Sequence, residues 1–291
     1  MIKKKLIKNA RKIDQFLIKF LKKQQSSLLV KPMKYGVISG GKKIRSTIIF
    51  DAGKIFNISE KKLINICAAV ECIHSYSLIH DDLPCMDNDT IRRGKPATHI
   101  KFGEASAVLA GSSLLTLAFE IIADKKYLLN PKAKNEIIKF LSSCSGHTGI
   151  AGGQELDLKF ENKKKGINQI IDMQKKKTGK LFNFCLYAVG VVAKKNTKDK
   201  LFLSNLGEEI GLLFQLADDF LDFRGLKKLL GKPVKKDHKK GKSTLLNLMG
   251  EKKAYLFANN LKRKILRKLE KHGKSAEELI STIEFILERK F

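Results

Sequence analysis

The stretch ECIHSYSLIHDDLPCMDND, residues 71–89, decides the fold class because its side chains repeat at helical spacing. Glu71, His74, Leu78 and Asp81 follow one another at intervals of three, four and three, which places them on one face of a helix. This face ends in a carboxylate. The pattern predicts a helix that presents acidic side chains at its C-terminal end.

The residues after this helix should fold back on it. A proline disfavours helical geometry in the residue before it, so Pro84 should turn the chain at Leu83. The turn can bring Asp87 back beside Asp81. A second acidic cluster, DDFLD, lies within a helical pattern further along the chain and presents Asp218 and Asp222, four residues apart, from one face.

The same helical periodicity extends over most of the chain, and its five prolines fall near expected helix edges. No break between helices is long enough, or sufficiently rich in Ser, Pro and Gly, to be an interdomain linker. The sequence therefore predicts an all-α fold in a single domain over residues 1–291. We expect helices over residues 2–23, 59–82, 104–123, 131–145, 167–193, 199–223, 251–270 and 275–289, and breaks at 37–42, 84–96, 149–153 and 225–242.

The net charge of +29 at first suggests a nucleic-acid or anionic-membrane partner. However, only eight of the 58 basic residues are Arg, the residue that bidentate phosphate recognition favours. Diffuse Lys enrichment is more typical of codon bias. A non-catalytic protein that binds nucleic acid or a membrane surface remains the alternative from another class, but it would not require paired acidic clusters. We expect no nucleic-acid partner.

Cysteine usage and apolar runs indicate the compartment. The five Cys residues form no CxxC pair, so neither a disulfide framework nor a zinc finger is expected, and a cytoplasmic setting fits best. No apolar run reaches the 18 to 20 residues, roughly, that a membrane-spanning helix needs. The longest, residues 105–119, lies between Glu104 and Glu120 and should be a buried helix rather than a transmembrane segment.

The acidic clusters point to a divalent cation. Carboxylates about 5 Å apart repel by roughly 3 kcal/mol per pair at an effective dielectric of 20, which a bound cation relieves. Oxygen ligands without a matching Cys or His set suit Mg²⁺, which also bridges phosphate oxygens. Adjacent Arg92 and Arg93, just after the first cluster, fit bidentate anion binding. The bland alternative is that the acids lie on a solvated helix surface.

Taken together, six motifs resemble the trans-isoprenyl diphosphate synthase family, and most closely its bacterial farnesyl-producing members. In chain order, from about residue 36 onward, they are GGKKIR, SLIHDDLPCMDNDTIRRGKP, GGQELDL, KKKTGKLF, FQLADDFLD and LGKPVKK with GKST. The resemblance implies an isoprenoid-synthase-type helical bundle around a central cavity, a homodimer, and two acidic motifs facing each other. It also implies Mg²⁺-dependent condensation of isopentenyl diphosphate with dimethylallyl and geranyl diphosphate, giving farnesyl diphosphate and pyrophosphate.

The resemblance assigns a role to each acidic residue. Asp81, Asp87 and Asp218 would ligate Mg²⁺. Asp82 and Asp222 would add ligands or hold metal-bound waters. With Lys177, the acids at 81, 82, 87 and 218 form the expected catalytic set.

The basic and polar residues of the motifs would hold the two diphosphate groups. The isopentenyl diphosphate would be bound by Lys42, Arg45, His74 and Arg93. The allylic diphosphate would be bound by Arg92, Lys177, Thr178, Gln215 and Lys232. This sequence departs from the family pattern GGKRxRP at two positions, where Lys43 replaces Arg and Ser46 replaces Pro. We expect the loop to be less rigid but still to bind the diphosphate.

Product length is expected to depend on Tyr76, which lies five residues, about 7.5 Å of helix, before Asp81. A bulky ring there with small Ser77 beside it resembles the farnesyl-length enzymes. The product should therefore have fifteen carbons. A geranylgeranyl diphosphate synthase is the nearest alternative, and a terpene cyclase is disfavoured by the second DDFLD.

Overall fold

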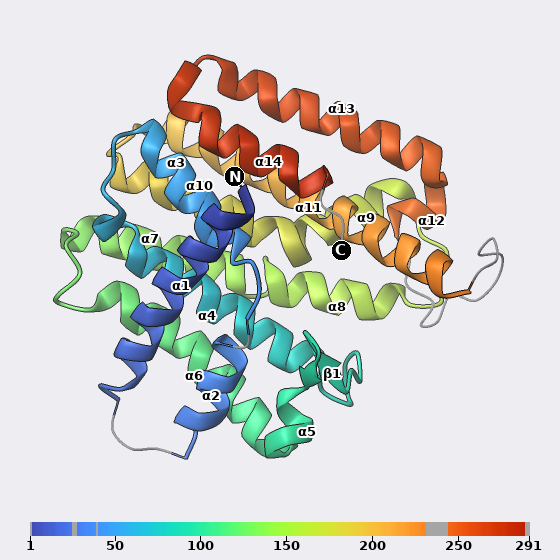
Figure 1. Cartoon of the computed structure of the whole chain (residues 1–291), viewed down its shortest axis with the longest axis horizontal. Coiled ribbons are helices and arrows are strands. Elements are labelled where there is room, and N and C mark those ends of the chain that lie inside the picture. Colours follow the sequence, from blue (N-terminus) through green and yellow to red (C-terminus); the bar gives the residue numbers. More distant parts are fainter. Residues whose placement is uncertain (1, 25–27, 39, 231–243, 289–291) are drawn as a thin grey trace. The chain divides into compact units, whose positions relative to one another are not determined.

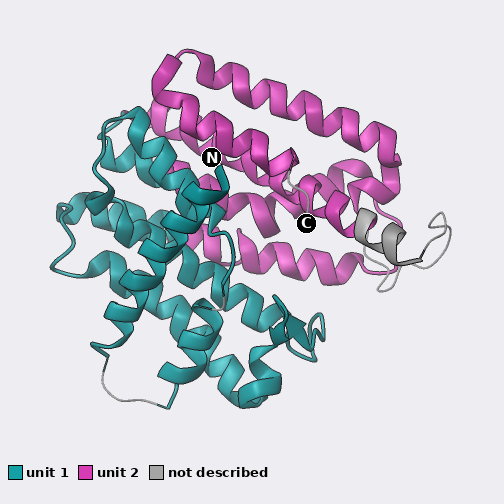
Figure 2. Ribbon diagram, in the orientation of Figure 1, with its two compact units in different colours: residues 1–141, 188–195 teal, residues 142–187, 196–291 magenta. Residues whose placement is uncertain are grey.

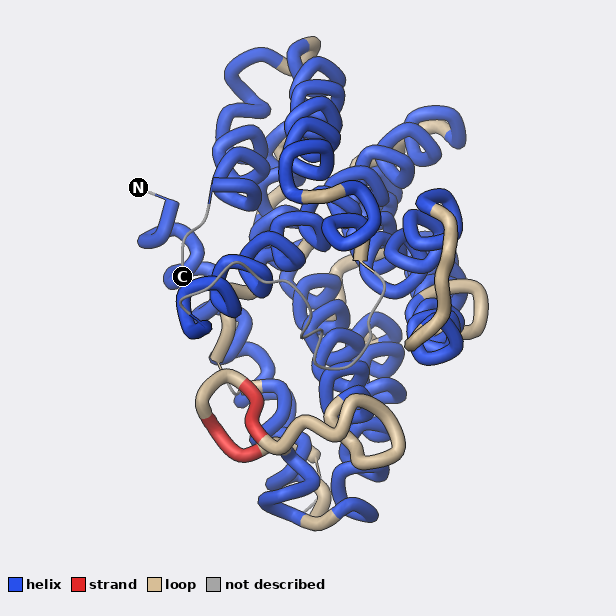
Figure 3. The backbone as a smooth tube through the Cα atoms, turned by 90° about the vertical axis from the view of Figure 1, so that its right-hand side faces the viewer, coloured by secondary structure: helices blue, strands red, loops and turns tan. Residues whose placement is uncertain are grey.

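The structure is a computed structural model that describes residues 2–24, 28–38, 40–230 and 244–288, without the side chains of 224–230. Helices account for nearly all regular structure in these residues (Figure 3). The strands described are β1 (Ile91–Arg92) and β2 (Lys95–Pro96), an antiparallel pair. The expectation of an all-α fold is confirmed.

The chain divides into two compact units (Figure 2). Unit 1 consists of residues 1–141 and 188–195, and unit 2 of residues 142–187 and 196–291. Each unit contains one of the two acidic clusters. The single domain expected from the sequence stays a prediction.

Unit 1 is built around a helix that is buried on nearly all sides. This helix, α4 (Ile64–Asp81), packs against several neighbours, most extensively α6 (Figure 1). A helix apolar all round belongs in a core, and α4 carries the first acidic cluster at its end. The other elements of this unit are α1 (Ile2–Leu21), α2 (Val30–Val37), α3 (Ile44–Ile55), η1 (Glu60–Lys62), α5 (Thr98–Phe102), α6 (Glu104–Ala123) and most of α7 (Pro131–Ser145).

Unit 2 has a corresponding central helix, α11 (Thr197–Leu230), which carries the second acidic cluster. It packs against a π-helical turn, Lys175–Gly179, and against two helices near the C-terminus, α13 and α14. The remaining elements are α8 (Ile150–Phe160), α9 (Ile167–Gln174), α10 (Lys180–Val192, its end belonging to unit 1), α12 (Leu245–Met249), α13 (Glu251–Glu270), η3 (Gly273–Ala276) and α14 (Glu277–Glu288).

Three predicted helices, 104–123, 131–145 and 251–270, have the expected bounds. Two predicted breaks are wrong in part. Residues 150–153 belong to α8, and α11 continues past Gly225 to Leu230. Gly153 does not form a turn. It allows another segment to approach closely, because a Cβ there would collide with the backbone of Lys177. The helices α2, α3, α5, α8 and α12 were not predicted.

Helix α6 is the apolar run that the sequence suggested as a buried helix. It is long and apolar enough to cross a membrane by length and composition, but 44% of its most apolar window is buried inside the protein. Leu114, Ala118, Ile121 and Ile122 are fully buried. Within the described residues, no other helix passes this test. One face of α6 is therefore buried inside the protein, while its other face is exposed.

Candidate functional site

The first acidic cluster forms a loop that folds back on the end of α4. The backbone N–H of Asp87 donates to the carbonyl of Asp81 at 2.8 Å, and that of Asp89 donates to the carbonyl of Asp82 at 3.2 Å. The turn expected after Leu83 is therefore present. It places residues 81 and 87, two expected metal ligands, side by side along the backbone.

The carboxylate of Asp82, which follows Asp81 in the sequence, is bound by an arginine. Asp82 is 2% exposed, and Arg92 Nε donates to its two oxygens at 3.0 and 3.2 Å. Arg92 Nη2 also bonds Asp82 and lies 3.4 Å from Asp89. The guanidinium therefore ties strand β1 to the acidic loop. The expected roles of Asp82 toward metal-bound water and of Arg92 toward the allylic diphosphate stay predictions.

Arg93 reaches the glycine-rich loop before α3. Its Nη1 donates to the carbonyl of Gly40 at 2.6 Å. Gly41 has a φ of 101°, and a Cβ there would lie 2.7 Å from the Arg93 guanidinium carbon. Only glycine suits this position. The contact brings Arg93 to the loop that carries the exposed side chain of Lys42.

The two departures from the family pattern meet at one buried acid. Lys43 is 6% exposed, donates to the carbonyl of Val37 at 3.0 Å, and lies 3.2 Å from Asp14 and 3.9 Å from Glu71. Ser46 donates to Glu71 Oε1 at 2.7 Å. Lys43 and Ser46, which replace the Arg and Pro of the family pattern, thus both lie close to the carboxylate of Glu71.

Arg45 and Arg93, two of the cations expected to bind isopentenyl diphosphate, lie near His74 in unit 1. Burial, and then the charges of Arg45, Arg93 and Lys43, hold the pKa of His74 well below its usual value. The imidazole is therefore neutral near pH 7. Arg45 lies in the first turn of α3 and is 9% exposed. Such a cluster suits an anionic ligand.

In unit 2, a π-helical turn presents the next expected residues. The turn Lys175–Gly179 interrupts the helix expected over 167–193, a distortion often found at functional sites. Lys177 donates through Nζ to Asp157 Oδ2 at 2.6 Å. Asp157, 8% exposed, comes from α8, which approaches this turn closely through Gly153.

A hydrogen-bond chain links the turn to the second acidic cluster. Thr178 donates to Gln215 Oε1 at 2.7 Å, and Gln215 donates to Asp219 Oδ1 at 2.9 Å. Gln174 donates to the other oxygen of Asp219 at 3.0 Å. Burial raises the pKa of Asp219 to about 7 in spite of these bonds. Thr178 and Gln215, both expected at the allylic diphosphate, are therefore in direct contact.

The remaining acids of this cluster are more accessible. Asp218 is half-buried and Asp222 is exposed, while Asp219 between them points inward. No group of three His, Cys, Asp or Glu in the described part of the chain is arranged to hold a metal by itself. The available side-chain ligands are carboxylate oxygens, the donor type that Mg²⁺ prefers. The chemistry of Asp81, Asp87 and Asp218 thus fits Mg²⁺.

The residues expected to set product length lie on α4. The Tyr76 side chain is 8% exposed and packs edge-on against the His80 ring, with centroids 5.4 Å apart. Ser77 donates to the carbonyl of His74 at 3.0 Å. Lys232, expected at the allylic diphosphate, lies outside the described residues.

Sequence reasoning missed four residues near these groups. Asp157 and Gln154 belong to the GGQELDL motif, and Asp219 belongs to DDFLD, so the signal was present without a role for each residue. Gln174 carried no signal. Gln154 is 7% exposed, and its amide has no hydrogen-bond partner among the described residues.

Comparison with known proteins agrees with this arrangement. The family described as Polyprenyl synthetase matches residues 26–284. Farnesyl diphosphate synthase of Escherichia coli is 38% identical over 270 residues, 91% of this chain and 90% of that protein. An FPP/GFPP synthase from Zymomonas mobilis has a TM-score of 0.88 at 36% identity and covers 98% of both chains.

A further solved structure carries ligands. It is a geranyltransferase from Helicobacter pylori complexed with magnesium and isoprenyl diphosphate, with a TM-score of 0.80 at 30% identity over 99% of this chain and 96% of that one. The family match spans most of the chain, and the relatives are similar along nearly their whole length. The chain therefore belongs to the polyprenyl synthetase family.

Proposed function

We propose that this protein is a Mg²⁺-dependent farnesyl diphosphate synthase, which joins isopentenyl diphosphate to dimethylallyl and then geranyl diphosphate. The observation that carries the proposal is that each unit holds carboxylates together with groups suited to a diphosphate. In unit 1, Asp81 and Asp87 occur together with the cations around His74. In unit 2, Asp218 occurs together with Lys177 and Thr178. The identity to farnesyl diphosphate synthases supports this reading.

The chain's own residues bind and orient the two substrates. Lys42, Arg45 and Arg93 hold the diphosphate of isopentenyl diphosphate, and neutral His74 adds a hydrogen bond. Lys177 and Thr178 hold the allylic diphosphate. Bound Mg²⁺, with Asp81, Asp87 and Asp218 as ligands, supplies positive charge that stabilises the departing pyrophosphate.

The reaction needs no side chain that acts as a general base. The allylic C–O bond breaks with its electron pair on the pyrophosphate, and the isopentenyl double bond attacks the allylic carbon. The proton then lost from the isopentenyl unit goes to a pyrophosphate oxygen. The negative charge on the leaving group is larger in the transition state than in the bound substrate, so fixed cations aimed at it accelerate the step.

Product length follows from the buried ring of Tyr76. The ring blocks growth beyond fifteen carbons, and His80 supports it from one side. His80 itself bonds the carbonyl of Val108 at 3.1 Å. Gly111 leaves space for the imidazole, because a Cβ there would collide with it. The stop is therefore braced by two residues of α6.

We also propose that residues 1–291 work as a single domain in a homodimer. The outward face of α6 supports the dimer, since it exposes two apolar side chains, Val108 at 42% and Leu109 at 53%. Exposed apolar patches of this kind favour association. A cytoplasmic location agrees with the free cysteines at positions 67, 72, 85, 144 and 185.

Product analysis tests the proposed function. Purified protein is incubated with dimethylallyl and isopentenyl diphosphates and Mg²⁺, and the prenyl alcohol is sized after dephosphorylation. A fifteen-carbon alcohol is the expected result. A twenty-carbon alcohol would indicate a geranylgeranyl diphosphate synthase, and no elongation would contradict the proposal.

A further inference from the structure

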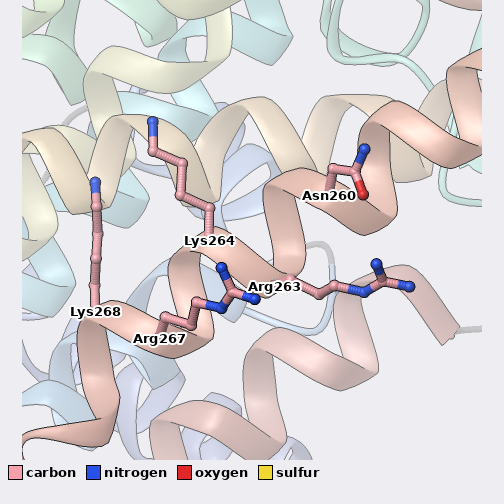
Figure 4. Close-up of a pocket in the computed structure, with 5 residues that line it drawn as sticks. All are labelled: Asn260, Arg263, Lys264, Arg267 and Lys268. Carbon is pink, nitrogen blue, oxygen red and sulfur yellow. The ribbon is translucent and has the colours of Figure 1, made fainter.

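The outward face of α13 is a strongly cationic surface that the proposed reaction does not use. Between Lys252 and Leu269 the helix has seven basic residues and no acid, and acids occur only at its two ends, Glu251 and Glu270. A groove of about 500 Å³ on this face is lined by Asn260, Arg263, Lys264, Arg267 and Lys268 (Figure 4).

The lysines and arginines of this groove differ in their partners. Lys264 and Lys268 point toward α11, where both bond Glu209, at 2.9 and 2.6 Å. Arg263 and Arg267 extend in a different direction from these lysines (Figure 4), are exposed, and have no ion-pair partner among the described residues. A single carboxylate thus pairs with both lysines, and two guanidiniums are left facing outward.

These arginines share a stripe with an exposed apolar side chain. Lys252, Leu256, Arg263 and Arg267 are spaced four, seven and four apart, which places them on one face of the helix. Leu256 is 59% exposed. The opposite face, with Ala254, Ala258, Ile265 and Leu269, is buried against the protein. The stripe is available to a partner.

We propose that this stripe docks the protein on the surface of an anionic lipid bilayer. The two outward-facing guanidiniums match lipid phosphates bidentately, and Leu256, about two helical turns before Arg263 on the same stripe, enters the headgroup region beside them. The chain's net charge of +29 steers the protein toward such a surface. Since the apolar face of α13 is used inside the protein, docking is electrostatic, reversible and sensitive to salt. If the proposed function holds, docking places an enzyme with a lipid-tailed product at the membrane.

Vesicle sedimentation with the full-length protein tests this proposal. The protein should bind phosphatidylglycerol vesicles, should bind phosphatidylcholine vesicles weakly, and should be released by salt. The double variant Arg263→Gln/Arg267→Gln should bind phosphatidylglycerol about 30-fold less tightly, since each basic residue near the surface contributes about fivefold. A matched control, Lys61→Gln/Lys62→Gln, removes the same charge from exposed positions in unit 1 and should change binding less than about threefold.

Three results would overturn the proposal. The wild-type protein fails to bind phosphatidylglycerol, both double variants lose binding equally, or the α13 variant keeps vesicle binding while losing duplex DNA binding. The last result would assign the stripe to nucleic acid. Pyrophosphate release from soluble substrates should be unchanged in both variants, which shows that they fold. Vesicle binding does not depend on turnover, so it can succeed or fail separately from the proposed function.

Discussion

Lys177 and Asp157 form a short ion pair, with Nζ 2.6 Å from Oδ2, between a π-helical turn and the neighbouring helix α8. The carboxylate is largely buried, and Gly153 one turn earlier on α8 allows the two backbones to touch. A lysine has four rotatable side-chain bonds, so an anion that fixes its ammonium reduces the entropy lost when a diphosphate binds. We therefore propose that Asp157 positions Lys177 for the diphosphate.

Replacing Asp157 tests this role. Asp157→Asn keeps the shape but removes the charge, and a hydrogen bond between charged groups contributes about 1.5–3 kcal/mol. We expect kcat/KM for dimethylallyl diphosphate to fall between about tenfold and a hundredfold. KM for isopentenyl diphosphate should change less than about threefold. Steady-state kinetics with each substrate varied in turn measures both.

The matched control is Glu155→Gln on the same helix, since Glu155 is exposed and its ion-pair partner among the described residues is Lys159, at 2.7 Å. Its kinetics should resemble those of the wild-type protein, and Asp157→Glu should recover part of the lost efficiency. If Asp157→Asn affected both substrates equally, or lowered only thermal stability, Asp157 would have no specific role toward Lys177.

Ser46→Ala should lower the free energy of unfolding by about 2 kcal/mol, because Glu71 is buried and would lose its hydroxyl donor at 2.7 Å. Urea unfolding at pH 7 measures the change. Ser281→Ala, at an exposed position on α14, is the control and should stay within about 0.5 kcal/mol of the wild type. Equal stability of the two variants would show that Ser46 does not stabilise Glu71.

Tyr76→Ala should shift the main product from fifteen toward twenty carbons, because the deletion removes a buried ring from the expected end of the product cavity. Tyr76→Phe keeps the ring without the hydroxyl and should still give fifteen carbons. Chromatography of the dephosphorylated products measures the ratio. An unchanged profile in Tyr76→Ala would remove Tyr76 as the length stop.

Leu109→Glu should convert the expected dimer into monomers, since it places a charge in the exposed apolar face of α6. Light scattering coupled to size exclusion gives the mass. Leu128→Glu is the control, because Leu128 is 69% exposed but lies outside α6. A wild-type monomer, or a dimer that survives Leu109→Glu, would argue against this face as the interface.

The sequence predicted features that depend on short-range geometry. The three-four-three spacing before Asp81 and the turn after Leu83 follow from local backbone preferences, and the structure has both. Three helices, over residues 104–123, 131–145 and 251–270, were predicted with the observed bounds for the same reason. The local sequence pattern was sufficient to predict the backbone wherever local steric preferences favour one conformation.

Features that depend on tertiary contact were missed. Gly152 and Gly153 suggested a break, yet they lie in α8 because another backbone packs on Gly153. The inward rotation of Asp219 depends on Gln174, 45 residues away. The Arg92 bond to Asp82 likewise joins a strand to a helix end. No periodicity encodes such pairings.

The central proposal is that Asp81 and Asp218 are both required for the Mg²⁺-dependent departure of pyrophosphate. Its most direct test is the initial rate of pyrophosphate release from dimethylallyl and isopentenyl diphosphates as a function of Mg²⁺ concentration. We predict that chelation abolishes release in the wild type, that Mg²⁺ restores it, and that Asp81→Asn and Asp218→Asn each lower the rate at least about a hundredfold. Release that ignores chelation, or a near-normal rate in either variant, would contradict the claim.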